Sequence, residues 1–319
     1  MRGFDRLLHL GNVVVDVVMN VPALPERGGD VLASATQLTA GGGFNVIAAA
    51  ARQGLQVGYA GAHGSGPFAA MARAALAAER AEILLPPKTG LDTGFTVSIV
   101  EPAGERTFVT SRGAEATLTA ANLGTVRAGP GDAIYVSGYG LVHRSNRAAL
   151  LGWLDRLGDG NVLFFDPGPL VQLIPAETLE PVLRRADWST CNAREAAMLT
   201  GRQDPVAATR ALARRAGRRN PAGRQGVLVR TGPAGCLVGQ GDAAPVAVPG
   251  FAVDVLDTNG AGDAHTGTFI AALARGAYEA DAARTANAAA ALSVTRRGPA
   301  TAPTAAELAR FLDEARERH

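Results

Sequence analysis

Lysine is nearly absent from this 319-residue chain. Of its 31 basic residues only Lys88 is a lysine, and the other thirty are arginine. A Walker-A phosphate loop, the strand lysine of protein kinases and a lysine Schiff base each need a lysine at a defined place, whereas Lys88 follows two prolines. If the protein handles phosphate, we therefore expect backbone N–H groups, arginine or a metal ion to hold it.

The chain also has few cysteines and little net charge. The two cysteines, Cys191 and Cys236, cannot form a disulfide framework, which favours a reducing cytoplasm. The net charge is only +2, and the one basic cluster, residues 214–219, fits a solvated helix end better than a nucleic-acid site. The charge-free run from Val31 to Ala51 is long enough for a membrane span, but its three consecutive glycines favour a strand, a turn and a helix. We therefore expect a cytoplasmic protein that binds neither nucleic acid nor membrane.

The order of strand and helix patterns predicts an α/β fold. From about residue 118 onward, short apolar runs alternate with helical stretches, which is typical of βαβ units with a parallel sheet covered on both faces. The expected strands are Ala133–Ser137, Val162–Asp166, Trp188–Cys191 and Val227–Arg230.

The first third of the chain has a different pattern, with exposed strands and turns. Here we expect a buried strand over Leu7–Met19, a second strand ending near Thr39, a helix from about Asn45 to Gln53, and a hairpin between Thr93 and Val109. The hairpin is predicted by short β-rich runs on either side of the turn Pro102-Ala103-Gly104.

The most informative segment is residues 257–263, Asp-Thr-Asn-Gly-Ala-Gly-Asp, which precedes an apolar helix. Its glycines let the backbone turn tightly and approach a ligand closely. The N–H groups of Gly260, Ala261 and Gly262 then lie at a helix N-terminus, where free donors and the helix dipole attract anions. The residues alone leave two interpretations open, an anion site or a capped helix in which Asp263 only complements the dipole.

The segment resembles the Asp-Thr-x-Gly-Ala-Gly-Asp signature of the ribokinase-like (PfkB) family of sugar and nucleoside kinases. Further matches follow in the family's order along almost the whole chain: Gly11 and Asp16, Gly41-Gly42-Gly43-Phe44-Asn45, Asn192-Ala193-Arg194-Glu195, Thr231-Gly232-Pro233-Ala234-Gly235, and Val294-Thr295-Arg296-Arg297-Gly298. The resemblance implies a three-layer α/β/α sandwich with a mostly parallel central sheet. It also implies one kinase domain over residues 1–319, with a small β-lid built from about 12–39 and 94–110.

The resemblance further implies the catalytic groups. Asp263 would be the general base that takes the proton of an acceptor hydroxyl as it attacks the γ-phosphorus of ATP. Gly260, Ala261 and Gly262 would form the anion hole around the transferred phosphoryl group. His265, two residues further along the helix, is expected to face away from the substrate.

On the nucleotide side, the resemblance implies bound ATP and Mg²⁺. Asn192 and Glu195, three residues apart on one helix face, would help to hold hydrated Mg²⁺; the alternative for this pair is a helix cap with an ordinary salt bridge. The resemblance also places Thr231, Gly232 and Gly235 in the nucleotide-side loop and Asn287 at the adenine. Asp257 would belong to a loop that binds a monovalent cation, for which K⁺ is the candidate.

On the acceptor side, Asp16, Gly41, Gly42 and Asn45 would bind paired sugar hydroxyls. Asn45 could instead cap the helix that it begins, or do both. Departures from the family pattern put ribose in doubt: Val14 stands where ribokinases have asparagine, Gly42 replaces a lysine, and Tyr139 falls near a ribose-contacting glutamate.

These departures leave the acceptor open. An aromatic Tyr139 suits a nucleoside, because a base can stack on the ring. Arg106 and Arg112 could clamp a phosphate or a carboxylate, or lie on a solvated hairpin face. We expect an ATP-dependent kinase of a small sugar or sugar derivative; the alternatives are a nucleoside kinase and a catalytically silent ligand-binding protein. Because a small lid buries little by itself, we also expect a homodimer formed through it.

Overall fold

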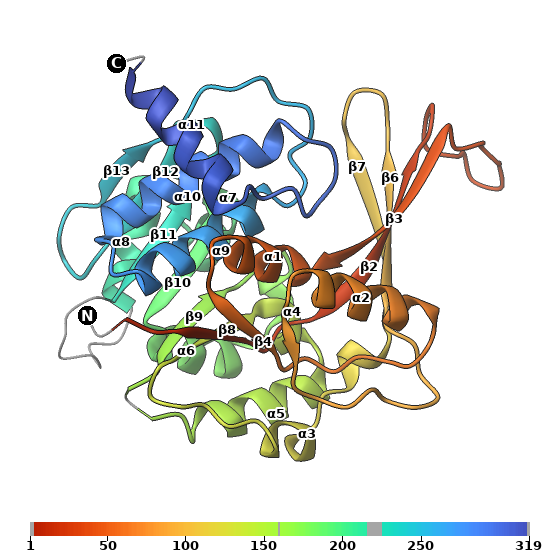
Figure 1. Ribbon diagram of the computed structural model, residues 1–319, viewed down its shortest axis with the longest axis horizontal. Helices are drawn as coiled ribbons and strands as arrows, with labels where there is room; N and C mark the ends of the chain where they lie inside the picture. The colour runs from red at the N-terminus through yellow and green to blue at the C-terminus, as the bar shows by residue number, and fades with distance from the viewer. Residues whose placement is uncertain (1–2, 159, 216–224, 318–319) are drawn as a thin grey trace.

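Two sheets organise the chain. The structure is a computed structural model that describes residues 3–158, 160–215 and 225–317. A nine-stranded, mostly parallel sheet forms the body, and a separate four-stranded sheet forms a lid beside it (Figure 1). The predicted α/β fold with a small β-lid is therefore confirmed.

The body sheet has the strand order β13-β12-β11-β10-β9-β8-β1-β4-β5. Its strands are β1 (Arg6–His9), β4 (Gln56–Tyr59), β5 (Glu82–Ile83), β8 (Asp132–Ser137), β9 (Val162–Asp166), β10 (Trp188–Asn192), β11 (Gly226–Arg230), β12 (Gly235–Gly239) and β13 (Val246–Pro249). The pairs from β5 through β11 are parallel, whereas β12 pairs antiparallel with both of its neighbours. All four strands predicted after residue 118 are present, each within one residue of its expected start.

Helices cover both faces of this sheet, because its buried strands are apolar on both sides. The longer helices are α1 (Phe44–Arg52), α2 (Pro67–Ala78), α5 (Arg144–Leu154), α6 (Ala176–Arg185), α7 (Ala193–Thr200), α8 (Pro205–Arg215), α9 (Ala261–Ala274), α10 (Glu279–Val294) and α11 (Ala305–Glu317). Short α-helical turns are α3 (Ala120–Gly124) and α4 (Gly138–Val142). The adjacent residues Leu7 and Leu8 of β1 belong to two different core clusters, one on each face.

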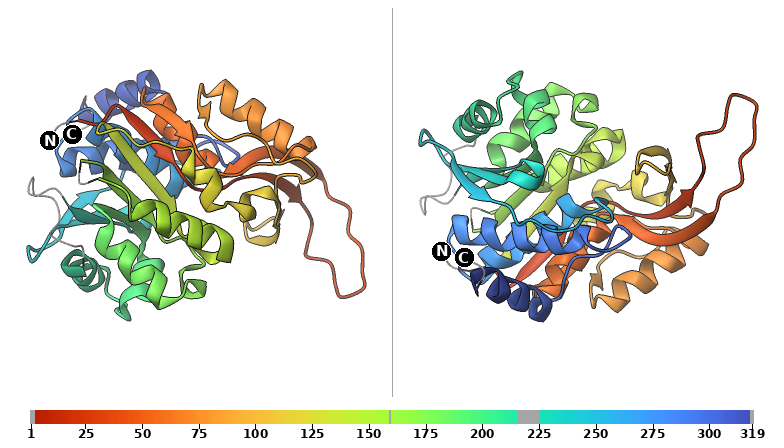
Figure 2. Two further views of the ribbon diagram at one scale, coloured as in Figure 1. Left: turned by 90° about the horizontal axis from the view of Figure 1, so that it is seen from below. Right: turned by 90° about the horizontal axis from the view of Figure 1, so that it is seen from above.

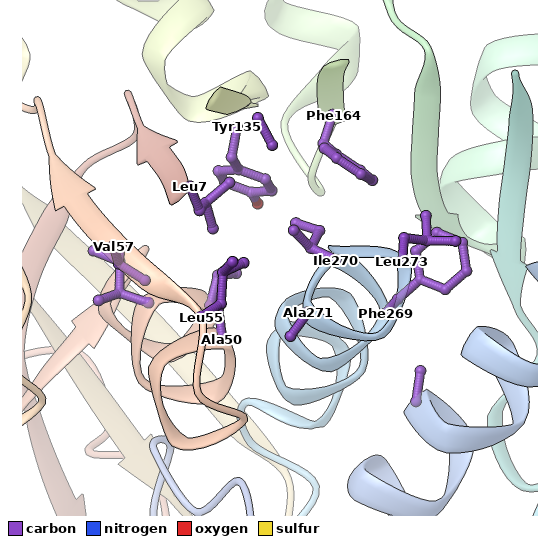
Figure 3. Packing of buried hydrophobic residues seen from close by; sticks show 14 of the residues in the cluster. Leu7, Ala50, Leu55, Val57, Tyr135, Phe164, Phe269, Ile270, Ala271 and Leu273 are labelled. Atoms are coloured by element: carbon purple, nitrogen blue, oxygen red, sulfur yellow. The ribbon is translucent and has the colours of Figure 1, made fainter. Parts of the chain in front are cut away.

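The core under α9 fixes the helix that carries the sequence signature. Ile270 of α9 points toward Phe164 and Tyr135 of the sheet, and Phe269 lies beside Leu273 on another side of the helix (Figure 3). Phe269 also packs edge-on against the buried Trp188, with ring centroids 5.0 Å apart. Burial of aromatic rings on both sides of this interface makes α9 a rigid part of the body.

The lid consists of β2 (Val13–Asn20), β3 (Ala35–Gly42), β6 (Phe95–Val100) and β7 (Arg106–Ser111), in the order β3-β2-β6-β7. The connection between β2 and β3 projects away from the body in both views of Figure 2. The expected hairpin is present as β6 and β7, which pair antiparallel.

One expected strand is wrong. Leu7–Met19 forms two strands in different sheets, β1 in the body and β2 in the lid. The chain leaves the body at Gly11, whose added Cβ would lie 2.6 Å from the His9 ring, and the N–H of Val13 then donates to the Tyr59 hydroxyl at 3.2 Å. A glycine allows this close passage, so an apolar run that reads as one strand changes sheets.

Two other expectations concern the surface. Arg214 and Arg215 end α8 with exposed side chains, as predicted for a solvated helix end, whereas Arg218 and Arg219 lie outside the described residues. No helix within the described ranges is long and apolar enough to cross a membrane.

Candidate active site

The residues singled out by sequence gather at one edge of the body sheet. Asp166, Asn192 and Arg230 are the last residues of the parallel strands β9, β10 and β11, and Ser137 ends β8 directly before the helix that carries Tyr139. The carboxyl ends of neighbouring parallel strands meet at the same edge, where α/β folds bind ligands. The lid sheet and the N-terminus of α9 complete the site.

The turn before α9 depends on glycine. Gly260 is the helix N-cap with φ 75°, and a Cβ at this position would lie 1.9 Å from the Pro299 carbonyl oxygen. Glycine alone fits both the left-handed conformation and this contact. The N–H of Ala261 is not free, contrary to expectation, because it donates to the Thr258 oxygen at 3.3 Å. No described residue accepts a bond from the N–H of Gly260 or Gly262, so these two donors are free to bind a ligand.

Asp263 is oriented by Asn45 of α1. The Asn45 amide donates to the Asp263 carboxylate, Nδ2 to Oδ2, at 2.9 Å. Burial raises the pKa of Asp263 to about 7; the Asn45 bond and the Arg230 charge act against this rise, and the charges of Asp166 and Asp16 add to it. A carboxylate with a pKa near neutrality suits general-base catalysis.

Asn45 does not cap its helix. The N-cap of α1 is Gly43, and Asn45 is the second helical residue. Asn45 is 5% exposed, and its carbonyl oxygen Oδ1 is buried without a hydrogen-bond partner. A buried acceptor of this kind is costly unless a ligand satisfies it, and it lies on the same amide that contacts the Asp263 carboxylate.

The expected acceptor residues of the lid also come together. Asp16 of β2 leans over Gly41 of β3, where an added Cβ would lie 2.1 Å from the Asp16 carboxylate. Burial raises the pKa of Asp16 to about 6. Gly42 follows with φ 59°, which turns the chain from β3 into α1. The glycines are therefore required to place Asp16 and Asn45 on one wall.

Tyr139 borders the same space. It lies on α4 with its side chain packed over Gly168, where an added Cβ would be 3.5 Å from the ring, and it is 38% exposed. Burial raises the pKa of Tyr139 to about 12, and the charges of Asp263, Asp166, Glu195 and Asp16 add to the rise. With 38% of its surface exposed, the Tyr139 side chain remains accessible to a ligand.

A buried charge cluster lies beneath the anion hole, and the sequence analysis missed its two central residues. Arg230 contacts Asp166 at 3.2 Å and Glu195 at 3.7 Å, and it donates to the Thr266 hydroxyl of α9 at 2.8 Å. A Cβ added to Gly262 would meet the Arg230 guanidinium at 3.4 Å. Arg230 thus places a buried positive charge beside the turn that begins α9. Both Asp166 and Arg230 end predicted strands, and this shared position is the signal that could have revealed them.

Asn192 and Glu195 form the helix cap that was the alternative interpretation. The N–H of Glu195 donates to the Asn192 side chain, and the N–H of Asn192 donates to the Glu195 carboxylate, both at 2.8 Å. A capping box of this type satisfies two free donors of α7. Burial and the neighbouring Asp166 raise the pKa of Glu195.

The same cluster fits hydrated Mg²⁺ better than directly bound metal. Two carboxylates, Asp166 and Glu195, share one guanidinium, so the cluster carries one net negative charge. Mg²⁺ commonly keeps several waters and uses one or two carboxylates together with substrate phosphates. Within the described part of the chain no group of three or more His, Cys, Asp or Glu side chains could hold a metal ion by itself.

The nucleotide-side loop is ordered, but Asn287 has another role. The Thr231 N–H and hydroxyl both donate to the Gly235 oxygen, at 2.8 and 3.0 Å, while Gly232 and Gly235 take left-handed φ values. Asn287 is buried; it donates to the oxygens of Val248 and Pro249, both at 3.0 Å, and its side-chain oxygen contacts His265. Its amide hydrogens are therefore used within the fold, and we no longer place it at the adenine. His265 faces α10, as expected.

The carboxylate of Asp257 is also engaged. Arg106 of β7 contacts it at 2.5 Å, and the N–H groups of Asn259 and Gly298 donate to it at 2.7 and 3.0 Å. A guanidinium and two amides leave little capacity for a monovalent cation, and the adjacent positive charge repels one. The expected K⁺ therefore does not fit at this carboxylate.

Neither hairpin arginine contacts the expected acceptor residues. Arg106 binds Asp257, so its position is neither a clamp for the acceptor nor a solvated hairpin face. Arg112 lines an open hollow of about 600 Å³ together with Arg144 and Arg147, and the residues that line this hollow include none of the expected acceptor contacts.

Comparison with known proteins identifies the architecture. The pfkB family of carbohydrate kinases matches residues 5–306. The chain belongs to this PfkB family. The PfkB kinase is 33% identical over 303 residues to an uncharacterized sugar kinase, YegV, of Escherichia coli (strain K12). The matched residues are 95% of this chain and 92% of the relative.

Solved PfkB-type structures share the fold. Aminoimidazole riboside kinase from Salmonella enterica, solved with aminoimidazole riboside and an ATP analog, matches with a TM-score of 0.78 at 24% identity over 96% of this chain and 99% of that chain. An Escherichia coli ribokinase-type structure with ATP and Mg²⁺ matches with a TM-score of 0.80 at 21% identity over 97% and 99%. The protein is thus a carbohydrate-kinase enzyme with the ribokinase-like fold.

Proposed function

We propose that this PfkB kinase transfers the γ-phosphoryl group of ATP to a hydroxyl of a small sugar or sugar derivative, with Asp263 as the general base. The observation that carries the proposal is the pairing of Asn45 with Asp263. One end of the Asn45 amide fixes the carboxylate, and the other end, Oδ1, is a buried acceptor without a partner. An acceptor hydroxyl that donates to Oδ1 would lie beside the base that removes its proton.

The reaction follows from this geometry. The acceptor oxygen forms a bond to the γ-phosphorus, the bond from that phosphorus to the bridging oxygen breaks, and ADP leaves with the electron pair. The hydroxyl proton passes to Asp263. The N–H groups of Gly260 and Gly262 and the α9 dipole receive the negative charge of the transferred group.

The lid and the charge cluster assist this step. Asp16 would bind further acceptor hydroxyls, and lid closure would exclude water from the phosphoryl group. Arg230 lies next to Gly262, where a cation favours the phosphate. Mg²⁺, held through water at Glu195, would neutralise the phosphates of ATP, whose base would lie beyond the turn at Thr231, Gly232 and Gly235.

A nucleoside is the second candidate acceptor. Tyr139 favours it, because the ring is 38% exposed and lies in the field of Asp263 and Asp16. A base could stack on this face while its ribose reaches Asp16 and Asn45.

We also propose a homodimer formed through the lid. The edge strands of the lid carry exposed apolar side chains, Leu38 on β3 and Phe108 and Val109 on opposite faces of β7, which are 46%, 55% and 61% exposed. Edge strands with exposed apolar side chains commonly pair with a second sheet. Light scattering of the wild type should give twice the chain mass, and Phe108→Ser should shift the protein toward the monomer; a wild-type monomer would refute the dimer.

An ADP-release screen over pentoses, hexoses, their phosphates, sugar acids and nucleosides tests the function. We expect acceptor-dependent ADP from the wild type, and a loss of about 100-fold to 10,000-fold in Asp263→Asn, as for removal of a general base. Asp254→Asn, at an exposed position in the preceding loop, is the matched control and should retain activity. Tight ligand binding without turnover on any acceptor would contradict the kinase and favour a silent binding protein.

A further inference from the structure

The lid reaches the catalytic loop through one ion pair. Arg106 is the first residue of β7, directly after the hairpin turn, and its guanidinium contacts the Asp257 carboxylate at 2.5 Å. The side chains are only 17% and 13% exposed. Glu101 and Glu105 lie in the same turn as Arg106, yet Arg106 contacts a carboxylate 151 residues away. The pair therefore joins two regions that sequence proximity would not bring together.

Asp257 is a junction between the two loops that border the anion hole. Its two oxygens accept the N–H groups of Asn259, one residue before Gly260, and of Gly298, one residue before Pro299. The Pro299 oxygen in turn packs where a Cβ of Gly260 would lie. Through these two hydrogen bonds, the carboxylate stabilises the shape of the anion-hole turn.

This junction carries a negative charge close to where an anionic phosphoryl group must bind. A half-buried carboxylate without a counter-charge would repel that group and would itself be costly to desolvate. A monovalent cation in this loop would supply the missing charge. In this chain the guanidinium already occupies the carboxylate, and its Nε is buried without a partner, so the arginine is committed to this one contact.

We propose that Arg106 takes the place of a monovalent cation at Asp257, so that the phosphoryl transfer is independent of K⁺ and the charge beside the anion hole is supplied by the lid. Arg106 is a positioning residue, since it acts through Asp257 on the anion-hole turn. When the lid opens, the charge leaves with it. Closure of the lid and completion of the anion hole are then one event. The inference rests on the proposed function, because it concerns the same phosphoryl transfer.

The test compares cations and variants with the acceptor found in the ADP-release screen. The wild-type rate should change less than about twofold when 100 mM KCl is replaced by choline chloride, in line with a fixed internal charge. Arg106→Gln should lose about 10-fold to 100-fold in choline and regain part of the loss in KCl, because the vacated carboxylate can then accept the ion. Arg106→Lys should retain more activity than Arg106→Gln in choline. Arg27→Gln removes the same charge from an exposed lid position and is the control.

A second measurement distinguishes a local effect of Arg106→Gln on the lid and the anion-hole turn from a general loss of folding. Hydrogen exchange of the Arg106→Gln protein should speed up in residues 95–111 and 257–260, while the β8–β11 strands keep their protection. Equal rates for wild type and Arg106→Gln in both salts would overturn the inference, as would a wild type that needs K⁺ by more than about tenfold. Neither outcome would contradict the proposed kinase function. Absence of turnover on every acceptor would instead refute the proposed function, and the exchange experiment would still test the Arg106–Asp257 contact.

Discussion

The body sheet and the lid sheet are built from strands of opposite character. Every residue of β8 is buried, whereas five of the six residues of β7 are exposed. Body strands are covered by helices on both faces, so their interiors are mainly apolar, and the site residues Asp166, Asn192 and Arg230 end β9, β10 and β11. The lid strands are less covered; Asp16 lies within β2, and Arg106 begins β7.

Because of this difference, the body and the lid contribute different kinds of groups to the site. The body holds Asp263, Arg230 and Glu195 in fixed positions, because α9 and the parallel strands are packed on all sides. In the proposed reaction the lid would supply groups that come and go with the acceptor, and a sheet with few buried side chains opens at low cost. Mutations should therefore act mainly on stability in the body and mainly on binding in the lid.

The largest contrast should appear in the cores. Phe269→Ala, which removes the α9 ring packed on Trp188, should lower the free energy of unfolding by about 3–5 kcal/mol. Leu32→Ala, in the exposed connection between β2 and β3 of the lid, should change it by less than about 0.5 kcal/mol. Urea denaturation of both variants measures the difference; equal losses would show that the lid is as tightly packed as the body.

Removal of the body cation comes next. Arg230→Met leaves Asp166 and Glu195 without a counter-charge, so unfolding should become easier by about 3 kcal/mol, and addition of Asp166→Asn should restore part of the loss. Arg214→Met breaks only an exposed pair with Asp242 and should cost about 0.5 kcal/mol or less. A small loss in the first variant would contradict the buried-cluster argument.

The pH profile distinguishes the carboxylates of the two regions. Because the base must be ionised, kcat/KM should fall below pH about 7, the pKa of Asp263. Asn45→Ala removes a donor to the ionised form, so the profile should move to higher pH. Asp16→Asn removes a repelling lid charge, so the profile should move to lower pH, on top of weaker acceptor binding. Shifts of the same sign in both variants would refute this assignment of charges.

The smallest effect should come from a single methyl group in the lid. Gly41→Ala places a Cβ against the Asp16 carboxylate and should raise the acceptor KM by about tenfold, with little change in kcat or in stability. Gly124→Ala in the body adds a Cβ that meets nothing within 4 Å and is the control. An unchanged KM would show that Asp16 can move aside.

The sequence predicted the strands of the body well, because a strand buried on both faces is a continuous apolar run. It failed at Leu7–Met19, where the same apolar character belongs to two sheets and only Gly11 marks the passage between them. Hydrophobic pattern reports burial, and it does not report which sheet a strand joins.

The site was predictable where a residue acts through the backbone or through a local motif. Gly260 and Asp263 follow from one seven-residue segment, and the capping box of Asn192 and Glu195 follows from its spacing. The contacts of Arg106 and Asn287 were not predictable, because their partners are remote in sequence and no local motif distinguishes these two residues from other arginines and asparagines. Their roles are decided by packing between elements.

That remoteness sets the order in which activity can appear during synthesis. The Asn45–Asp263 contact joins residues 218 positions apart, and the Arg106–Asp257 contact joins residues 151 positions apart. A nascent chain that has folded its lid and the first parallel strands holds the acceptor residues but neither the base nor the anion-hole turn. Contacts of such high sequence separation form late in folding. The reactive carboxylate, carried on one of the last helices, therefore reaches the acceptor wall only after the scaffold that controls it is in place.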